Sequence, residues 1–296
     1  MPTTTAVVTT AGSHTSRVRR SPRPRAGRIV SVVLIVLWSI VPIYWSLRTS
    51  LMTEAQANSR PTRFAPFPPT FDNFAEVLWE GSLAEDLRRS MVNIVIECAA
   101  ATIVTVVLAT LAAYAFARFE FRGKNLLFFA VLATMAFPPY TTLIPLYRLM
   151  SSVGLVNTYT GLVLVYVSGF LPLATWILHN YFASLPRSLE EAGLVDGAGR
   201  MRVLWSIVLP LAIPAIASTA LITFLFAWGQ FLFPLVLTSD SSTQPITVII
   251  SALQGRRVVP TTVISAAGML AIAVPAILAI MFNRYIVRGL LAGSTK

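Results

Sequence analysis

The sequence predicts an all-α polytopic membrane protein with six transmembrane helices and a short helix-turn-helix outside the membrane. Of its 296 residues, 55% are hydrophobic and only 12% are charged, and the mean hydropathy of +0.72 lies outside the range of ordinary soluble domains. Six apolar segments are each long enough to cross about 30 Å of hydrocarbon as a helix. A polar stretch, SLEEAGLVDGA, separates the fourth segment from the fifth and is too hydrophilic to lie in a bilayer.

The chain begins with a basic tail and a first span. Residues 1–28 contain TSRVRRSPRPRAGR and lack any apolar periodicity that could build a core, so we expect a disordered, basic, cytoplasmic tail. The apolar run that follows, Ile29 to Leu47, is about twenty residues long and is not closed by an A-x-A cleavage pattern. It therefore predicts a retained span and not a signal peptide.

Five further apolar segments follow the first. They cover roughly Met91 to Ala117, Leu126 to Leu149, Tyr159 to Phe182, Ser206 to Leu237, and Thr262 to Ile286. Six spans place both termini on one side, and Lys and Arg are more numerous on that side than on the other. We therefore expect a multi-pass protein of the bacterial plasma membrane with both termini in the cytoplasm, residues 289–296 forming a C-terminal tail.

The composition excludes several kinds of chemistry. One cysteine, Cys98, cannot form a disulfide framework, and two histidines, His14 and His179, cannot form a zinc-type cluster, so no metal site is expected. Neither lysine, Lys124 or Lys296, stands in a P-loop, so we expect no nucleotide site, no cofactor and no enzymatic activity in this chain. No basic stripe interleaved with aromatic residues occurs in a soluble segment, so nucleic acid is not an expected partner.

The external loop, about residues 50–90, contains RFAPFPPTFDNFAEVLWEG. Its prolines favour an extended entry, and Asp72 or Asn73 can cap a short helix from Phe74 to Trp79. Phe74, Val77 and Leu78 share one face of that helix. Two interpretations remain open: a lid packed on its own spans, or a docking site for an external partner.

The cytoplasmic loop, about residues 183–206, predicts a helix that begins at Ser188. Ser188 and Glu191 have the spacing of a capping box, and Pro186 ends the preceding span. Leu189, Ala192 and Gly193 fall on one face, where small residues would let another surface approach closely. The alternative is an interfacial linker in which Glu191 only caps its own helix.

Gly197 predicts the turn of the helix-turn-helix. Glycine tolerates the positive φ that ends a helix, so the chain can turn there into a second helix, Gly199 to about Val208, before Pro210.

The stretch EEAGLVDGAGRMRVLWSIVLPLAIP resembles the EAA loop of binding-protein-dependent ABC transporter permeases. The positions that match its pattern in register are Glu191, Ala192, Gly197, Ile207, Leu209 and Pro210, and Gly193 stands in place of the second alanine. The segments AAYAFARFEFRGKNLLFF, PLYRLMSSVGLVNTYTGLVL and NRYIVRGL are similar to those of carbohydrate-uptake permeases of the maltose-transporter type. Where that family often has W-N-D/E-F, this chain has Trp228, Gly229, Gln230 and Phe231.

The resemblance implies that residues 29–288 are the permease domain of an ATP-driven importer of a sugar or oligosaccharide. It further implies a second homologous permease, two subunits that bind ATP and Mg, and an external solute-binding protein as partners, besides membrane lipid. The coupling residues that it implies are Glu190, Glu191, Ala192, Gly193, Asp196, Gly197, Ala198, Leu209 and Pro210. A permease for another solute and a secondary transporter remain as alternatives.

Polar residues within the spans are the candidates for a solute path. They are Asn93, Glu97, Tyr140, Trp228 and Gln230. Glu97 is the one acidic residue inside an apolar segment, where a charge costs on the order of 3 kcal/mol, and it lies on a stripe with Ala101 and Thr105. That stripe fits either tight helix packing or a wall of the path. Trp228 and Gln230 suit the ring face and the hydroxyls of a sugar, although a lone Trp is more often a packing residue.

Overall fold

The computed structural model describes residues 25–80, 83–255 and 259–292, which form helices, turns and loops without a strand. The expected tail at residues 1–28 therefore lies almost wholly outside the described residues, as does the end of the C-terminal tail at 293–296. The chain divides into two compact units, Met1–Trp45 and Ser46–Lys296. Each unit is described by itself.

Within the first unit lies most of helix α1 (Arg25–Ser50). The stretch Ile29–Ser50 is apolar enough to cross a membrane, and every side chain from Ile29 to Trp45 is exposed. Exposed apolar side chains around the whole circumference are typical of a helix whose solvent is lipid. The helix predicted from the first apolar run is therefore confirmed.

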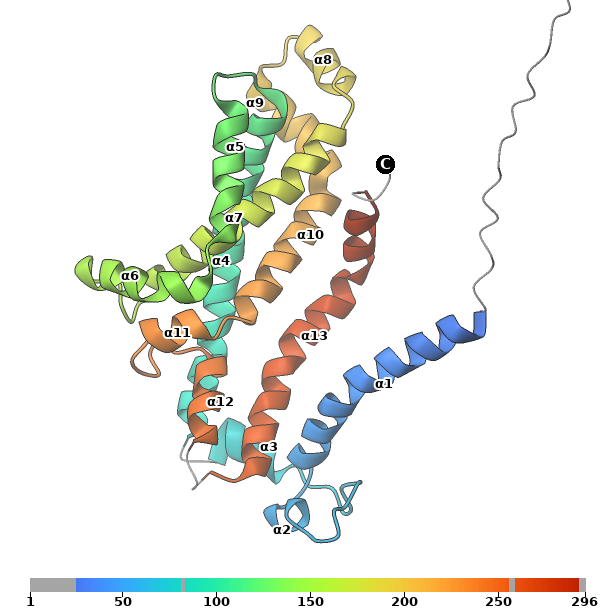
Figure 1. The fold of residues 1–296 in the computed structure, drawn as a ribbon, viewed down its shortest axis with the longest axis vertical. Helices are drawn as coiled ribbons and strands as arrows, with labels where there is room; N and C mark the ends of the chain where they lie inside the picture. The colour runs from blue at the N-terminus through green and yellow to red at the C-terminus, as the bar shows by residue number, and fades with distance from the viewer. Residues whose placement is uncertain (1–24, 81–82, 256–258, 293–296) are drawn as a thin grey trace, which may run out of the picture. The chain divides into compact units, whose positions relative to one another are not determined.

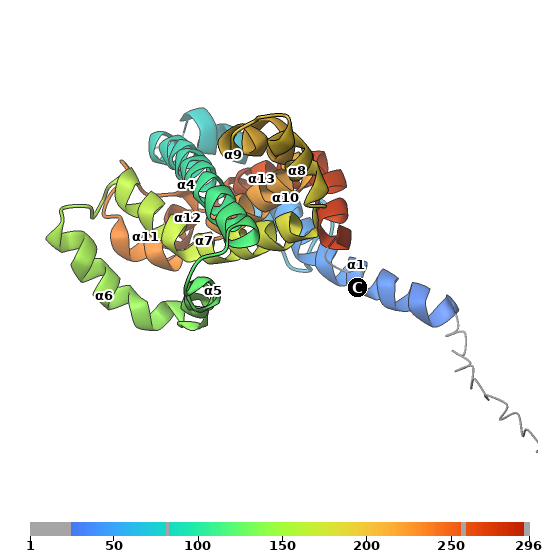
Figure 2. The same ribbon diagram turned by 90° about the horizontal axis from the view of Figure 1, so that it is seen from above.

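The second unit is built on four long helices that lie side by side: α4 (Ala84–Arg118), α7 (Tyr159–Ser184), α10 (Leu209–Trp228) and α13 (Thr261–Ala292) (Figures 1 and 2). Helix α4 packs against α7 and α10, and α10 packs against α13. Small residues contribute to these contacts, with Ala109 and Ala113 of α4 in one buried cluster with Ala174 of α7 and Ala212 of α10. Small side chains let helix backbones approach closely, which is how helices associate in lipid.

The third apolar segment is not the single span expected at Leu126 to Leu149. It consists of α5 (Lys124–Ala133), a 3₁₀ turn η2 (Thr134–Ala136) and α6 (Pro139–Ser152), and the two parts are bent by 100°. Pro138 and Pro139 cause the break, because proline lacks an N–H and its ring excludes the α conformation from the preceding residue. Within the described ranges, five helices are long and apolar enough to span a membrane, or six if the bent pair is one span.

The fifth span also differs from the expected Ser206 to Leu237. A continuous helical stretch runs from Arg200 to Trp228 through α9 (Arg200–Val203), a π-helical turn η3 (Leu204–Val208) and α10. The chain then leaves the helix at Gly229, and α11 (Leu232–Leu237) is a separate short helix. Pro234 fits in the first turn of α11, where backbone N–H groups have no partner within the helix.

The external loop folds against the end of the bundle opposite α8 (Ser188–Val195) (Figure 1). It contains α2 (Glu54–Ala57), α3 (Asp72–Ala75) and a π-helical turn η1 (Glu76–Glu80), and α12 (Ile246–Gln254) lies near the same end. The predicted helix in this loop is confirmed, and Val77 is buried in one cluster with Leu87 and Ile94 of α4. The contacts are those of a lid packed on its own spans.

The predicted cap of that helix is wrong. Phe71 holds the N-cap position without a side-chain hydrogen bond. Asn73 is buried instead, and its Nδ2 donates to the carbonyl oxygens of Ser50 at 2.9 Å and Met52 at 2.8 Å. Buried carbonyls need donors, so the Asn73 amide satisfies the backbone at the end of α1 and cannot cap its own helix.

Replacing Asn73 with alanine should destabilise the loop, because two carbonyl oxygens would lose their donor. We expect a loss of about 2 kcal/mol in the free energy of unfolding, measured by thermal unfolding of the purified protein. Asn58→Ala is the matched control, since Asn58 is exposed and its amide donates only to Glu54. Equal melting temperatures for the two variants would contradict this role of Asn73.

Candidate functional site

Helix α8 begins just after α7 ends, at the end of the bundle opposite α2 and α3 (Figure 1). The first turn is closed by backbone bonds, with the N–H groups of Glu190 and Glu191 both donating to the carbonyl of Arg187 at 3.0 Å. Arg187 is the N-cap residue and has helical dihedral angles, and no side chain caps the helix. The predicted capping box of Ser188 and Glu191 is therefore wrong, because Ser188 already lies inside the first turn, past the position from which a side chain can cap.

The predicted turn at Gly197 is confirmed. Gly197 has φ +83°, and the N–H of Ala198 donates to the carbonyl of Gly193 at 3.0 Å. This is the six-to-one bond of a Schellman motif, which ends a helix with a glycine in the left-handed region. The chain then passes through Gly199, the N-cap of α9, so α8 and α9 form the helix-turn-helix expected from the sequence.

The two faces of α8 have different partners. Gly193 is buried, and a Cβ there would stand 2.7 Å from Cδ1 of Ile207 and 3.3 Å from Cγ2 of Val203. The expectation that Gly193 faces outward with Leu189 and Ala192 is wrong, because successive residues on a helix are about 100° apart and Gly193 turns toward α9 and η3. Leu189 and Ala192 remain exposed.

The exposed face of α8 is mainly apolar. Leu189, Ala192 and Val195 lie at i, i+3 and i+6, and Val195 is 87% exposed. Glu191 and Asp196 are exposed beside them. Among the described residues, Glu191 forms no ion pair. This apolar row and the carboxylate beside it are accessible to another protein.

Glu190, by contrast, is bound inside the chain. Its Oε1 accepts a hydrogen bond from Nε of Arg118 at 2.5 Å, and its Oε2 accepts one from the hydroxyl of Tyr114 at 3.1 Å. Arg118 also donates through Nη2 to the carbonyl of Leu185 at 3.0 Å. The side chains of Arg118 and Glu190 are only 6% and 13% exposed. Neither Tyr114 nor Arg118 is among the site residues predicted from the sequence, where the signal is a basic residue at the end of an apolar span.

A small cavity of about 160 Å³ opens beside this cluster and is lined by Glu190, Glu191, Arg118 and two further arginines, Arg187 and Arg200. The Arg200 guanidinium stands 5.2 Å from the ring centroid of Phe119. In the described ranges, no group of three or more His, Cys, Asp or Glu residues could hold a metal ion.

The remaining coupling candidates lie where α9 becomes α10. Ala198 and Leu209 are half-buried and pack against the alanine-rich cluster of α4, α7 and α10, whereas Pro210 is exposed. The expectation that the second helix ends before Pro210 is wrong, because the helix continues to Trp228. The π-helical turn η3 precedes Pro210, and a π turn widens the backbone so that a proline can follow without breaking the helix.

Asn93 and Trp228 make internal hydrogen bonds. Nδ2 of Asn93 donates to the carbonyls of Ser241 at 3.0 Å and Gln244 at 3.1 Å, and its Oδ1 accepts from the hydroxyl of Tyr159 at 2.6 Å. Nε1 of Trp228 donates to the carbonyl of Ala271 at 3.2 Å, and the ring is buried. Within this chain, both side chains hold elements together.

The other three solute-path candidates lie on separate elements. Glu97 is fully buried in α4, and neither carboxylate oxygen has a hydrogen-bond partner among the described residues. Ala101 and Thr105 of the same stripe are also buried, as the interpretation of tight helix packing requires. Tyr140 is 77% exposed on α6, and Gln230 is half-buried in the turn before α11. A solute path through the five candidates stays a prediction.

In the loop between α11 and α12, Asp240 accepts several hydrogen bonds. Hydrogen bonds from the side chain and the backbone N–H of Ser242, and from Asn157, hold the pKa of the Asp240 carboxyl below its usual range. Asn157 also accepts from Thr243 at 2.7 Å. The loop between α11 and α12 is therefore tied to the loop before α7.

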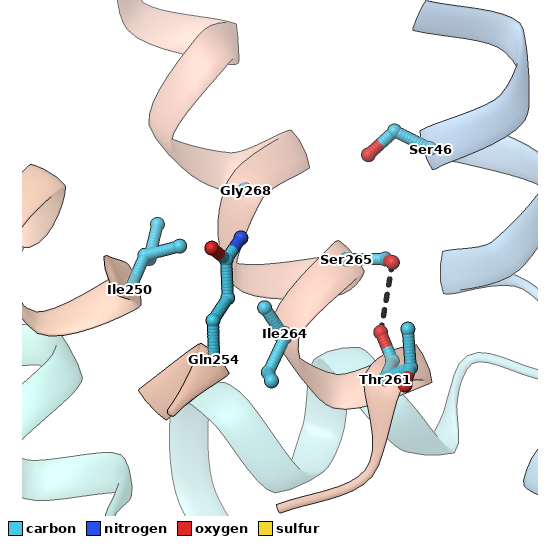
Figure 3. A pocket seen from close by; sticks show the side chains of 7 residues that line it. All are labelled: Ser46, Ile250, Gln254, Thr261, Ile264, Ser265 and Gly268. Carbon is cyan, nitrogen blue, oxygen red and sulfur yellow. Dashed lines mark hydrogen bonds between the residues drawn. The ribbon is translucent and has the colours of Figure 1, made fainter. Parts of the chain in front are cut away.

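A second cavity, of about 360 Å³, lies between α12 and α13 and carries none of the predicted site residues (Figure 3). Gln254 points into it, and the Ser265 hydroxyl on its wall donates to the Thr261 carbonyl at 2.8 Å. Its polar side chains, those of Ser46, Gln254, Thr261 and Ser265, are uncharged.

Comparison with known proteins gives one consistent result. Residues 73–291 match the family described as binding-protein-dependent transport system inner membrane component. A trehalose/maltose transport system permease protein of Thermococcus litoralis is 34% identical over 90% of this chain and 95% of its own. A trehalose transport system permease protein of Mycobacterium tuberculosis is 33% identical over 89% of this chain and 94% of its own.

A sulfoquinovosyl glycerol transport system permease protein of Agrobacterium fabrum is 33% identical over 91% of this chain and 93% of its own. Among solved structures, a chain of a bacterial ABC transporter involved in the import of the acidic polysaccharide alginate superposes with a TM-score of 0.73. It is 24% identical in sequence, and the match covers 88% of this chain and 96% of that chain. The fold is therefore that of an ABC transporter membrane subunit.

A valine at position 193 should separate α8 from α9, because there is no space for its side chain beside Ile207 and Val203. Overpacking of this kind costs about 1–3 kcal/mol, and we expect faster tryptic cleavage at the exposed Arg187, Arg200 and Arg202. Gly199→Val is the matched control, since Gly199 has an ordinary φ and no atom near its missing Cβ. Equal cleavage rates would contradict the close approach at Gly193.

Proposed function

Since the chain belongs to the binding-protein-dependent transport system inner membrane components, we propose that it is the permease subunit of an ATP-driven importer of a sugar or oligosaccharide. The chain is similar over most of its length to transport proteins for carbohydrates and carbohydrate derivatives. This similarity supports the substrate class. The exposed face of α8 is the observation that supports the proposal most directly, because a separate ATPase can bind to it.

The energy source lies on other subunits. No lysine in the sequence stands in a P-loop, so we assign ATP and Mg to two ATP-binding subunits. One of them contacts this chain at Leu189, Ala192, Val195 and Glu191. We propose a second homologous permease and an external solute-binding protein as the remaining partners, and the family description supports the binding protein. A secondary transporter would use charged relays in several spans, and Glu97 is the single acidic residue within the apolar segments.

The solute path runs between the two permeases. Exposed Tyr140 and half-buried Gln230 are available to line it from this side, with an aromatic ring and an amide that suit a sugar. A permease for a different solute is the alternative, and the same assembly would serve it.

We place α8 and both termini in the cytoplasm and the η1 turn outside the cell. In intact cells an impermeant thiol reagent should label Glu76→Cys but label Ser188→Cys only after permeabilisation. Both positions are exposed at opposite ends of the second unit, and the native Cys98 is buried and gives little background. Labelling of Ser188→Cys from outside would overturn the orientation.

Replacing Glu191 with alanine should release the ATPase and abolish uptake while the subunit still inserts and accumulates. The carboxylate has no internal ion pair to lose, so the change falls on the contact with the partner, where loss of one charge of a buried pair costs about 2 kcal/mol or more. Co-purification of the ATPase and uptake of labelled maltose and trehalose are the measurements. Glu76→Ala, an exposed acid at the other end, is the control. Normal association and uptake in Glu191→Ala would favour the interfacial-linker interpretation.

A further inference from the structure

Helix α4 is unlike the other long helices of the second unit. Its 35 residues include neither proline nor glycine, whereas α7, α10 and α13 contain Pro172, Pro214 and Pro275 in their interiors. Sharp helix kinks occur almost always at proline, at glycine or at π turns. Helix α4 therefore lacks the residues at which sharp kinks usually form, and it is about 52 Å long at 1.5 Å per residue.

The inner end of α4 is bound to α8. Arg118, its last residue, and Tyr114, one turn earlier, both donate to the carboxylate of Glu190, and Arg118 also holds the carbonyl of Leu185. These bonds to a largely buried carboxylate are charge-assisted and therefore strong. A displacement of α8 must move the end of α4 or break them.

The outer end of α4 is bound to the loop between α11 and α12. Asn93 donates to the carbonyls of Ser241 and Gln244 and accepts from Tyr159 at the start of α7. Asn93 is 1% exposed, so water does not compete for these bonds. About 37 Å of helix axis separates Asn93 from Arg118.

We propose that α4 is a rigid lever that transmits the movement of α8 to the outer loop at Ser241–Gln244. Tyr114, Arg118 and Glu190 are the inner positioning residues, and Asn93 is the outer one. The inference rests on the proposed function, because it takes α8 as the element that the ATPase moves. The parallel route through α10 is softer, since it passes through a π-helical turn, Pro210 and Pro214.

The stiffness of α4 can be tested without touching either end. Ile103 and Val107 are exposed on α4 at 64% and 53%, and we compare a double glycine variant with a double alanine variant at these positions in the full transporter. Both variants remove the same exposed side chains, but only glycine loosens the helix backbone. The readouts are sugar moved per ATP hydrolysed, and the ATP-induced change in amide hydrogen exchange over residues 239–244.

The double alanine variant should match the wild type in both readouts. In the double glycine variant the ratio of sugar to ATP should fall about fivefold or more, as for the loss of a typical coupling between distant sites, and the exchange response of the outer loop should disappear. Equal responses in the two variants, or a wild type without any response in the outer loop, would overturn the lever. A wild type that shows the response but moves no sugar would overturn only the proposed substrate class.

The inner end can be tested by exchanging its charges. Arg118→Glu and Glu190→Arg should each abolish the response of the outer loop, and the double exchange should restore it, because an ion pair forms again in reverse. A purely local structural role predicts recovery of protein yield without recovery of that response, and this outcome would overturn the assignment. Asn93→Leu should leave ATPase association intact and remove only the response of the outer loop.

Discussion

Close helix packing through small side chains is the constraint on which the rest of this structure depends. In lipid, helices gain little from burying apolar surface, because the solvent is itself apolar, so van der Waals contact between closely approaching backbones must hold the bundle together. The buried alanines and threonines of α4 provide this contact against α7 and α10.

The middle of the helix bundle is held by side-chain packing, whereas its two ends are held by hydrogen bonds. Carboxylates, amides and arginines with defined partners lie mainly where the helices leave the apolar zone: Glu190 with Arg118 at one end, and Asn93, Asn157 and Asp240 at the other. A polar tie at such a position avoids the cost of a charge in the middle of the bilayer. The arrangement fixes the loop that carries α8 and the loop between α11 and α12 to the helix bundle, and it leaves the lipid-facing surface apolar.

The two adjacent glutamates of α8 have separate tasks because a helix turns about 100° from one residue to the next. Glu190 points toward α4 and orients the helix, and Glu191 remains exposed beside Val195. Gly193 allows the close contact with Ile207 that holds the back of α8. The buried face of α8 thus anchors the helix to the rest of the chain, while its exposed face remains accessible.

The sequence by itself determined the class of protein, the apolar segments, the turn at Gly197 and the family, because these follow from local composition and from a motif with fixed spacing. Tertiary structure decided the break at Pro138 and Pro139 into a 100° bend, and the continuation of the fifth helix through Pro210. It also decided the roles of Asn73, Glu190 and Trp228, whose partners lie far away in the chain. Local patterns report how a segment folds, whereas a side chain's hydrogen-bond partner depends on which segments the fold brings together, and local sequence patterns do not reveal that pairing.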